Sequence, residues 1–335
     1  MKVAIIYNLI ETLERGFEKD MLAEEEILKV MRGVKMALVS SGHSVKSFQA
    51  TPSLFASGQL KGFDMVFNLA ESFGTNVAGE PYIPAALEMM GLPFTGSGAE
   101  TLAICLDKVR TKQIFISAGI TTPRFWVFKK VPTRSRKYPY PLIVKPTKED
   151  ASIGISTDSV VHNQKDLKKK IAFIIKNYKQ PALVEEYIDG REINVAILGN
   201  GNHLKVLPVS EIIFDLPEGL PRIVSFEAKW IEDHVMYKGT VRKCPADLSK
   251  KESELIRRMA TTAYRLMKCN DYARIDIRLA NGIPYVLEVN PNPDISYQDS
   301  GFAVAARRAG KKYPDLIRQI VTNAIRRHNA SRKGY

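Results

Sequence analysis

Cysteine is scarce in this sequence of 335 residues. The three cysteines, Cys105, Cys244 and Cys269, are odd in number and far apart along the chain. This distribution argues against a disulfide framework and against a CxxC metal site. We therefore expect reduced thiols that serve mostly as packing residues.

The sequence also lacks a long apolar run. No stretch approaches the roughly 20 apolar residues that a helix needs to cross a bilayer. The opening residues, MKVAIIYNLIE, contain an early acidic residue and lead to no small-residue cleavage site, so they do not fit a secretory signal. No internal repeat or low-complexity stretch is evident. These absences predict a cytoplasmic protein without a membrane span.

Acidic residues are fewer than basic ones. The 49 lysines and arginines outnumber 36 aspartates and glutamates and give a net charge of +13. Such an excess suits nucleic acid, a membrane surface or small anionic substrates. The basic residues are dispersed in small clusters, however, and no basic stripe interleaved with aromatics accompanies them. A solvated surface is the favoured interpretation, and nucleic-acid binding is not expected.

Strand and helix patterns alternate over the first hundred residues. Apolar runs at 3–7, 44–48 and 64–69 predict strands, whereas helical spacing follows from about residue 20 to 42 and over 83–90. This alternation predicts an α/β unit with a doubly wound parallel sheet, helices on both faces and ligands beyond the carboxyl ends of the strands.

Two further lobes of mixed α+β type are predicted after the turn-rich segment 95–98. The middle lobe would hold a helix over 100–118, strands at 140–146 and 182–188, and a helix over 166–178. The last lobe would contain a helix over 250–267, a helical segment over 301–327 and four strands, at 193–198, 203–209, 272–279 and 284–289. We therefore divide the chain into residues 1–98, 99–187 and 188–335.

The strongest set of polar residues lies on two predicted strands of the last lobe. Arg274 and Asp276 stand two apart in one strand, and Glu288 and Asn290 stand two apart in the next. Alternation brings Asp276, Glu288 and Asn290 to facing surfaces, where their oxygens suit a hard divalent cation. The alternative is a polar strand face with an ion pair.

A second set lies in the middle lobe. Lys145 leaves an apolar strand just before the glycine-containing loop EDASIGIS, residues 149–156. A lysine beside such a loop can bind phosphate oxygens while backbone N–H groups close over them. About 40 residues later in the sequence, the acidic strand ALVEEYI offers Glu185 and backbone groups to an adenine. The alternative is an ordinary edge strand with solvated acids.

The order of these motifs resembles the ATP-grasp superfamily, in particular carboxylate–amine ligases similar to D-alanine:D-alanine ligase. The resemblance runs from about residue 67 through the C-terminal helix. The motifs that carry it are DKVRTK (107–112), AGITTP (118–123), PLIVKP (141–146), EDASIGIS (149–156), LVEEYIDGREINVAIL (183–198), FEAKW (226–230), CPADLS (244–249), RIDIRL (274–279) and YVLEVNPNP (285–293).

The resemblance implies a three-lobed ATP-grasp fold and an ATP site between the second and third lobes. The residues implied to bind ATP are Lys108, Lys145, Ser152, Glu185, Glu186, Tyr187, Ile188, Glu192 and Lys229. Asp276, Glu288 and Asn290 match a site for two Mg²⁺ ions, or Mn²⁺ in their place. Lys229 matches a lysine on the transferring phosphate, and Arg274 matches the arginine that stabilises the tetrahedral intermediate.

The activity implied by the resemblance is amide-bond formation between small amino-acid-like substrates. ATP would convert a carboxylate to an acyl phosphate, an amine would attack it, and ADP and phosphate would leave. A loop at 222–240 would exclude water from the intermediate. Relatives commonly form dimers through the first lobe, so the resemblance also implies a homodimer.

Several departures from the family pattern fall on substrate positions. The glycine-rich Ser-x-Glu segment has no clear equivalent in residues 8–27, and the usual serine and tyrosine are replaced by Ala151 and Trp230. Asp294 and Asp299 stand where the family has a glycine and a serine. Because a carboxylate at 299 would repel another carboxylate, we hypothesise an amine acceptor that carries positive charge.

Glu71 and Glu80, in the altered segment NLAESFGTNVAGE, are further candidates for binding a substrate amine. Each has the alternative of a loop residue with no special role. For the whole chain, the alternatives left open are a literal D-alanine:D-alanine ligase, a kinase-like ATP-grasp protein that needs no amine, and a nucleotide-binding regulator without turnover.

Overall fold

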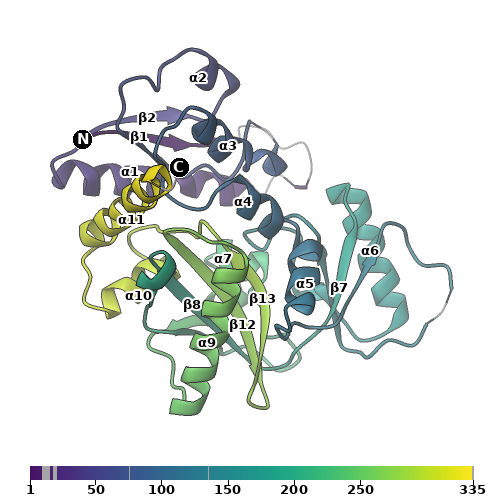
Figure 1. Cartoon of the computed structure of the whole chain (residues 1–335). Coiled ribbons are helices and arrows are strands. Elements are labelled where there is room, and N and C mark those ends of the chain that lie inside the picture. The colour runs from purple at the N-terminus through teal and green to yellow at the C-terminus, as the bar shows by residue number, and fades with distance from the viewer. Residues whose placement is uncertain (10–15, 18–20, 75, 135, 334–335) are drawn as a thin grey trace.

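The computed structural model describes residues 1–9, 16–17, 21–74, 76–134 and 136–333, and these residues form three sheets (Figure 1). The first is parallel in the order β2-β1-β3. Its strands and the helices around it are β1 (Lys2–Tyr7), α1 (Met21–Ser40), β2 (Ser44–Gln49), α2 (Pro52–Ala56), β3 (Met65–Asn68) and α3 (Tyr82–Met89).

Both faces of this sheet are covered. On β1, Val3 and Ile5 pack into the core beneath α1, whereas Ala4 and Ile6 pack into a separate core with residues of α2 and α3. This alternation is what a strand buried on both sides requires. The prediction of a doubly wound parallel sheet is confirmed.

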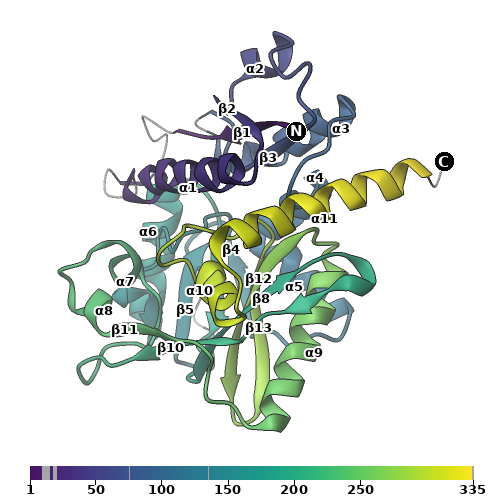
Figure 2. The same cartoon turned by 90° about the vertical axis from the view of Figure 1, so that its left-hand side faces the viewer.

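The last helix, α11 (Tyr313–Lys333), packs along α1 (Figure 2). Leu316, Ile317 and Ile320 of α11 are fully buried in the same core as Val34 and Leu38 of α1. The first sheet is therefore tied to the end of the chain.

The second sheet is antiparallel in the order β4-β7-β5-β6. Its elements are α4 (Ala99–Leu106), α5 (Lys108–Ser117), β4 (Phe125–Phe128), β5 (Leu142–Pro146), β6 (Val160–Val161), α6 (Gln164–Tyr178) and β7 (Ala182–Glu186). The helix expected over 100–118 is two helices, because the side chain of Asp107 accepts from the N–H groups of Val109 and Arg110 and starts α5 anew.

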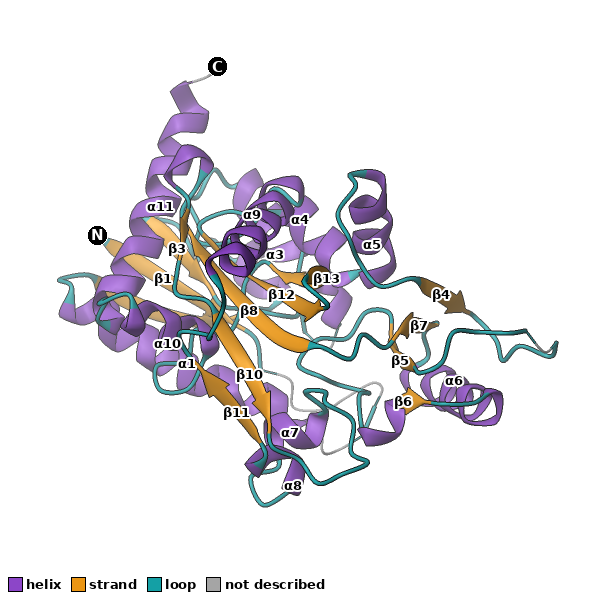
Figure 3. Cartoon of the chain, turned by 90° about the horizontal axis from the view of Figure 1, so that it is seen from below, coloured by secondary structure: helices purple, strands orange, loops and turns teal. Residues whose placement is uncertain are grey.

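The third sheet runs in the order β11-β10-β8-β12-β13 (Figure 3). The short strand β9 pairs with β8. Its strands are β8 (Arg191–Leu198), β9 (Lys205–Val206), β10 (Ser210–Phe214), β11 (Thr240–Lys243), β12 (Tyr272–Ala280) and β13 (Ile283–Asn290). The helices are α7 (Phe226–Trp230), α8 (Val235–Lys238), α9 (Lys250–Leu266) and α10 (Gly301–Arg308), and short 3₁₀ turns are η2 (Val77–Gly79), η3 (Thr157–Ser159) and η4 (Gly201–His203).

Some sequence expectations need correction. The strand expected at 203–209 is only β9, and the segment over 301–327 contains two helices, α10 and α11. The strands β4, β10 and β11 were not predicted, because each is short and partly exposed and shows no clear alternation.

The expectation of reduced packing cysteines is confirmed. The three cysteines are buried and free of disulfides, and no helix in the described part of the chain has the length and apolar character of a membrane span.

Candidate active site

The polar residues of β12 and β13 share one face of the third sheet. Asp276 lies opposite Glu288, and Arg274 lies opposite Asn290, in the antiparallel ladder between these strands. Residues directly opposite each other in such a ladder project to the same side. The structure therefore brings together the three predicted metal ligands and the predicted oxyanion arginine.

Asp276 is surrounded by donors. The Arg274 guanidinium donates to both carboxylate oxygens at 2.7 Å each. The amide of Asn194 donates to Oδ1 at 2.8 Å, and that of Asn290 donates to Oδ2 at 3.1 Å. Asn194 was missed by the sequence analysis, because its place beside Asp276 depends on the pairing of β8 with β12.

Lys108 links this face to the second sheet. Its ammonium, at the start of α5, donates to Asp150 Oδ1 at 2.8 Å and to the Glu149 carbonyl at 2.7 Å, and lies 3.6 Å from Glu288 Oε2. Burial would lower the pKa of Lys108, but Asp150 and Glu288 raise it above its ordinary value. Lys108 is therefore a fixed positive charge.

Glu288 is held ionised by its surroundings. Burial would raise the pKa of Glu288, but Lys108, Lys145 and Arg274 lower it from its ordinary 4.5 to about 2. The described residues contain no group of three or more histidine, cysteine, aspartate or glutamate side chains placed for a metal ion. A divalent cation here would rely on Asp276, Glu288, an amide oxygen and groups outside the chain.

A buried ion triad lies on the second sheet. The Glu185 carboxylate forms ion pairs with two lysines, with Lys145 at 3.1 Å from one oxygen and Lys112 at 3.1 Å from the other, and Lys112 also donates to the Thr122 hydroxyl at 2.8 Å. Burial raises the pKa of Glu185, but the two lysines outweigh it and lower the pKa. Glu185, expected as an acceptor for adenine, is thus paired within the protein in this structure.

Lys112 was also missed, although its motif was recognised. Its side chain is fully buried. Burial lowers the pKa of Lys112 to about 8, although Glu185 acts in the opposite direction. The signal was a second lysine four residues after Lys108, on the same side of α5.

The residues expected at the nucleoside end follow β7. Glu186 forms an ion pair with Arg124, the backbone N–H of Tyr187 donates to the Pro141 carbonyl at 3.1 Å, and Ile188 is half-buried just beyond the strand. Glu192 accepts from Arg278 at 2.7 Å. Burial raises the pKa of Glu192, although Arg278 acts to lower it.

The loop 149–156 of the second lobe is bonded to the segment 222–230 of the third. The Ser152 hydroxyl donates to the Val224 carbonyl at 2.8 Å, the Phe226 N–H donates to the Ile155 carbonyl at 2.8 Å, and the Trp230 indole donates to the Ala151 carbonyl at 3.0 Å. These three bonds join the second and third lobes at this point.

Lys229, on the same segment, has an exposed side chain whose ammonium lies 4.8 Å from the centre of the Trp230 ring. Partial desolvation and Arg274 lower the pKa of Lys229, whereas Asp294, Glu71 and Asp150 act to raise it. Lys229 therefore lies near enough to Arg274 and to two of the predicted substrate residues, Asp294 and Glu71, to respond to their charges.

The four predicted substrate residues lie on loops. Asp294 accepts from the Ser296 N–H at 2.7 Å and its hydroxyl at 3.1 Å. Glu80 is hydrogen-bonded to Asn292, and burial, with Asp150 and Glu71 nearby, raises the pKa of Glu80 well above its ordinary value. Residues 10–15 and 18–20 and the side chains of 21–26, where a Ser-x-Glu equivalent was sought, lie outside the described residues.

The surroundings of Asp299 include a cation that the sequence did not reveal. Arg242, on β11, donates to the Asp299 carbonyl at 2.6 Å. Gly301 leaves it room, since a Cβ there would approach the Arg242 Nε to 3.1 Å. The expected repulsion of a substrate carboxylate by Asp299 is therefore opposed by a neighbouring guanidinium.

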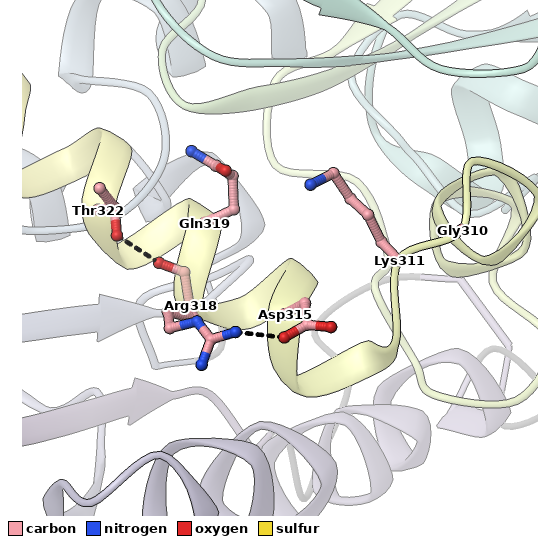
Figure 4. Close-up of a pocket in the computed structure, with 6 residues that line it drawn as sticks. All are labelled: Gly310, Lys311, Asp315, Arg318, Gln319 and Thr322. Atoms are coloured by element: carbon pink, nitrogen blue, oxygen red, sulfur yellow. Dashed lines mark hydrogen bonds and ion pairs between the residues drawn. The ribbon is translucent and has the colours of Figure 1, made fainter.

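A groove of about 460 Å³ lies elsewhere, at the junction of α10 and α11 (Figure 4). It is lined by polar residues, including Arg318, which pairs with Asp315 and accepts from Thr322 at its carbonyl. None of the predicted site residues lines this groove. We therefore do not assign the chemistry to it.

The matching family model and the similar proteins point to the same family. The family model described as "D-ala D-ala ligase C-terminus" matches residues 114–322. The D-alanine–D-alanine ligase of Bordetella petrii is 33% identical over 96% of this chain and 92% of its own. The uncharacterized protein y4sG of Sinorhizobium fredii is 39% identical over 79% of this chain and 75% of its own.

Among solved structures, the D-alanine–D-alanine ligase from Bacillus anthracis complexed with ATP superposes with a TM-score of 0.76, covering 99% of both chains at 20% identity. The fold and the site together define an ATP-grasp enzyme, an ATP-dependent carboxylate–amine ligase. Within that class, the chain belongs to the D-alanine–D-alanine ligase family.

Proposed function

We propose that this ligase joins the carboxylate of one small amino-acid-like substrate to the amine of a second and releases ADP and phosphate. One observation carries the proposal: Lys108, on the second lobe, lies 3.6 Å from Glu288 on the third, and Lys145 of the second lobe also acts on Glu288. Such a junction can hold phosphate oxygens on one side and a divalent cation on the other.

Asp276, Glu288 and Asn290 would hold Mg²⁺, as two ions or with Mn²⁺ in its place. Their fit is chemical, because all three offer the oxygen ligands that Mg²⁺ prefers. The Asn290 amide would first have to rotate, since its nitrogen now faces Asp276. When bound, the cation would neutralise negative charge on the phosphates.

The remaining roles follow from position. Lys108, Lys145 and the loop at Ser152 would bind phosphates, and Lys229 would reach the phosphate in transfer. Adenine and ribose would lie along Glu185, Glu186, Tyr187, Ile188 and Glu192. Arg274 would exchange part of its pairing with Asp276 for the developing oxyanion of the tetrahedral intermediate.

The substrates would lie against Glu71, Glu80, Asp294 and Asp299. D-alanine is one candidate, because it is named in the relatives. Arg242 beside Asp299 supports an acceptor that carries a carboxylate as well as its amine, in place of the purely cationic acceptor suggested by Asp299 alone.

We further propose that the protein is a cytoplasmic homodimer. Light scattering after size-exclusion chromatography measures its mass in solution, and a monomer of 37.6 kDa at every concentration would contradict the dimer.

The function is tested by incubating the protein with Mg²⁺-ATP and a panel of D- and L-amino acids, dipeptides and amines. We expect ADP in equal amount to a condensed product identified by mass. Lys145→Ala should abolish this turnover, whereas Lys165→Ala, an exposed lysine of the same lobe, should leave it unchanged. ADP release that needs no amine would instead identify a kinase, and ATP binding without turnover would identify a regulator.

A further inference from the structure

Arg278 is a buried cation on the same sheet face as the predicted metal ligands, and the sequence analysis did not single it out. In the ladder between β8 and β12 it stands directly opposite Glu192, two residues along from the pair formed by Asp276 and Asn194. Directly opposed residues project to the same side of a sheet. Arg278 is only 4% exposed, so its charge needs partners within the protein.

The Arg278 guanidinium joins β12 to the start of β8 and to the segment 222–230. It donates to Glu192 Oε2 at 2.7 Å, to the Gly190 carbonyl at 2.8 Å and to the Arg222 carbonyl. A planar guanidinium can bond to several acceptors at once in fixed directions, which a lysine ammonium cannot do. Arg278 therefore fixes the position of an acidic side chain and of two backbone segments together.

Tyr187 strengthens the contact with Arg222. The Arg278 guanidinium lies 5.9 Å from the centre of the Tyr187 ring, within the range of a cation–π interaction. The Tyr187 hydroxyl donates to the Arg222 carbonyl at 3.3 Å and accepts from the Arg222 N–H at 3.1 Å. The segment 222–230, which bonds farther along to the loop 149–156, is therefore anchored at its first residue beside Glu192.

Glu192 keeps one carboxylate oxygen for a ligand. Its Oε2 accepts from Arg278, whereas the described part of the chain forms no hydrogen bond to its Oε1. The Glu192 side chain is 12% exposed, which leaves it partly accessible. A carboxylate with one oxygen held by a guanidinium presents the other in a set direction, and that oxygen can only accept a hydrogen bond while the group is ionised.

We propose that Arg278 is a positioning residue, which orients Glu192 to accept from a ribose hydroxyl of the nucleotide and links that contact to the segment 222–230. This inference deepens the ligase function proposed above and rests on it. Its consequence is that the protein selects ribonucleotides by a pair of residues, since Glu192 makes the contact and Arg278 sets its direction.

The test compares the affinity for ATP with that for 2′-deoxy-ATP and 3′-deoxy-ATP. Each is titrated with Mg²⁺ in a calorimeter, without amino-acid substrates. We expect the unmodified protein to bind ATP about tenfold or more tightly than at least one analogue, because the missing hydroxyl leaves Glu192 without its donor. Arg278→Met should bring this ratio to near unity. Equal affinities of the unmodified protein for all three nucleotides would overturn the proposal.

Arg191→Met is the matched control. Arg191 precedes Glu192 on β8 and so projects to the other face of the sheet, where it forms two bonds to the Glu211 carboxylate and one to the Asp247 carbonyl. This variant should lower Tm and keep the preference for ATP. A preference that falls equally in both variants would overturn the assignment, because general destabilisation would then explain it.

Arg278→Lys serves if Arg278→Met does not fold. It keeps the positive charge but loses the planar set of donors, so the preference for ATP should be weaker than in the unmodified protein. An unchanged preference in Arg278→Lys would contradict the proposed orientation of Glu192.

Hydrogen exchange measured by mass spectrometry tests the link to the segment 222–230. Saturating Mg²⁺-ATP should slow exchange of its backbone amides in the unmodified protein and in Arg191→Met, but much less in Arg278→Met. Equal slowing in all three proteins would refute this link.

This inference and the ligase function fail in different experiments. Preference for ATP that depends on Arg278, without any condensed product, would support the inference and contradict the ligase. A condensed product without any ribose preference would do the reverse, and a protein that binds no nucleotide would contradict both.

Discussion

The two ends of the candidate site are built differently. At the end where we propose that nucleotide and metal bind, the charged residues sit on strands or at a helix start and pair with one another, as Lys145 does with Glu185 and Arg274 does with Asp276. At the substrate end, Glu71, Glu80, Asp294 and Asp299 all lie on loops. Strands and a helix start thus hold the residues proposed for the chemistry common to the family, and loops hold the proposed substrate residues.

This comparison predicts that substitutions of the charged residues on the strands reduce activity the most. Glu288→Gln keeps the shape but removes the charge that faces Lys108. We expect kcat to fall on the order of a hundredfold or more, with a weaker response to added Mg²⁺. The measurement is ADP release across an Mg²⁺ titration.

Glu211→Gln is its control, since Glu211 is buried on β10 and paired with Arg191 in the same sheet. This control should lose stability and retain activity. Equal activity in the two variants would show that Glu288 has no role in the reaction.

The loop 149–156, proposed to bind phosphate, tests whether a substitution in a loop can have as large an effect as one in a strand. Gly154 has φ of +79°, and a Cβ there would lie 2.5 Å from the Pro146 Cγ. Gly154→Ala should therefore lower the free energy of unfolding by about 1 to 3 kcal/mol and weaken ATP binding. Urea unfolding and nucleotide titration measure the two effects. Gly58→Ala, also at positive φ but with open space around it, should cost less.

The stability that the charged residues on the strands contribute should also depend on pH. Because the pKa of Glu288 is lowered from 4.5 to about 2, its ionised form stabilises the native state above pH 4.5. That contribution is lost as pH falls from 4.5 towards 2. Urea unfolding should give a difference in the free energy of unfolding between the unmodified protein and Glu288→Gln at pH 7, and this difference should be smaller at pH 3. A difference that grows in acid would contradict the ion network.

The smallest effect is expected from removing one of the three hydrogen bonds that join the loop 149–156 to the segment 222–230. Trp230→Phe removes the bond to the Ala151 carbonyl, and KM for ATP should rise only a few-fold because the Ser152 and Phe226 bonds remain. Trp126→Phe, the other tryptophan, should leave KM unchanged. Steady-state kinetics measure the KM for ATP of each variant. An identical KM in the two variants would show that the Trp230 bond does not contribute to ATP binding.

The same contrast explains what the sequence could predict. Arg274, Asp276, Glu288 and Asn290 were grouped correctly on one face, because two-residue spacing on strands is a local property. Asn194 and Arg242 were missed, since their roles depend on strands paired from distant segments. Whether the grouped residues bind ATP and metal stays a prediction.

The break between α4 and α5 shows a second limit. The run 100–118 has helical spacing throughout, but Asp107 caps a new helix and so sets the direction of Lys108. A capping residue inside a periodic run is a weak signal in sequence and a strong one in structure.

The contact between α1 and α11 bears on how the molecule is made. Val3 and Ile5 share their core with Leu316 and Ile317, so residues at opposite ends of the chain must meet to complete it. During synthesis the first lobe would leave the ribosome long before its partner helix exists. Its apolar face would stay uncovered through most of translation, and such late closure makes folding slow and the nascent chain prone to aggregate.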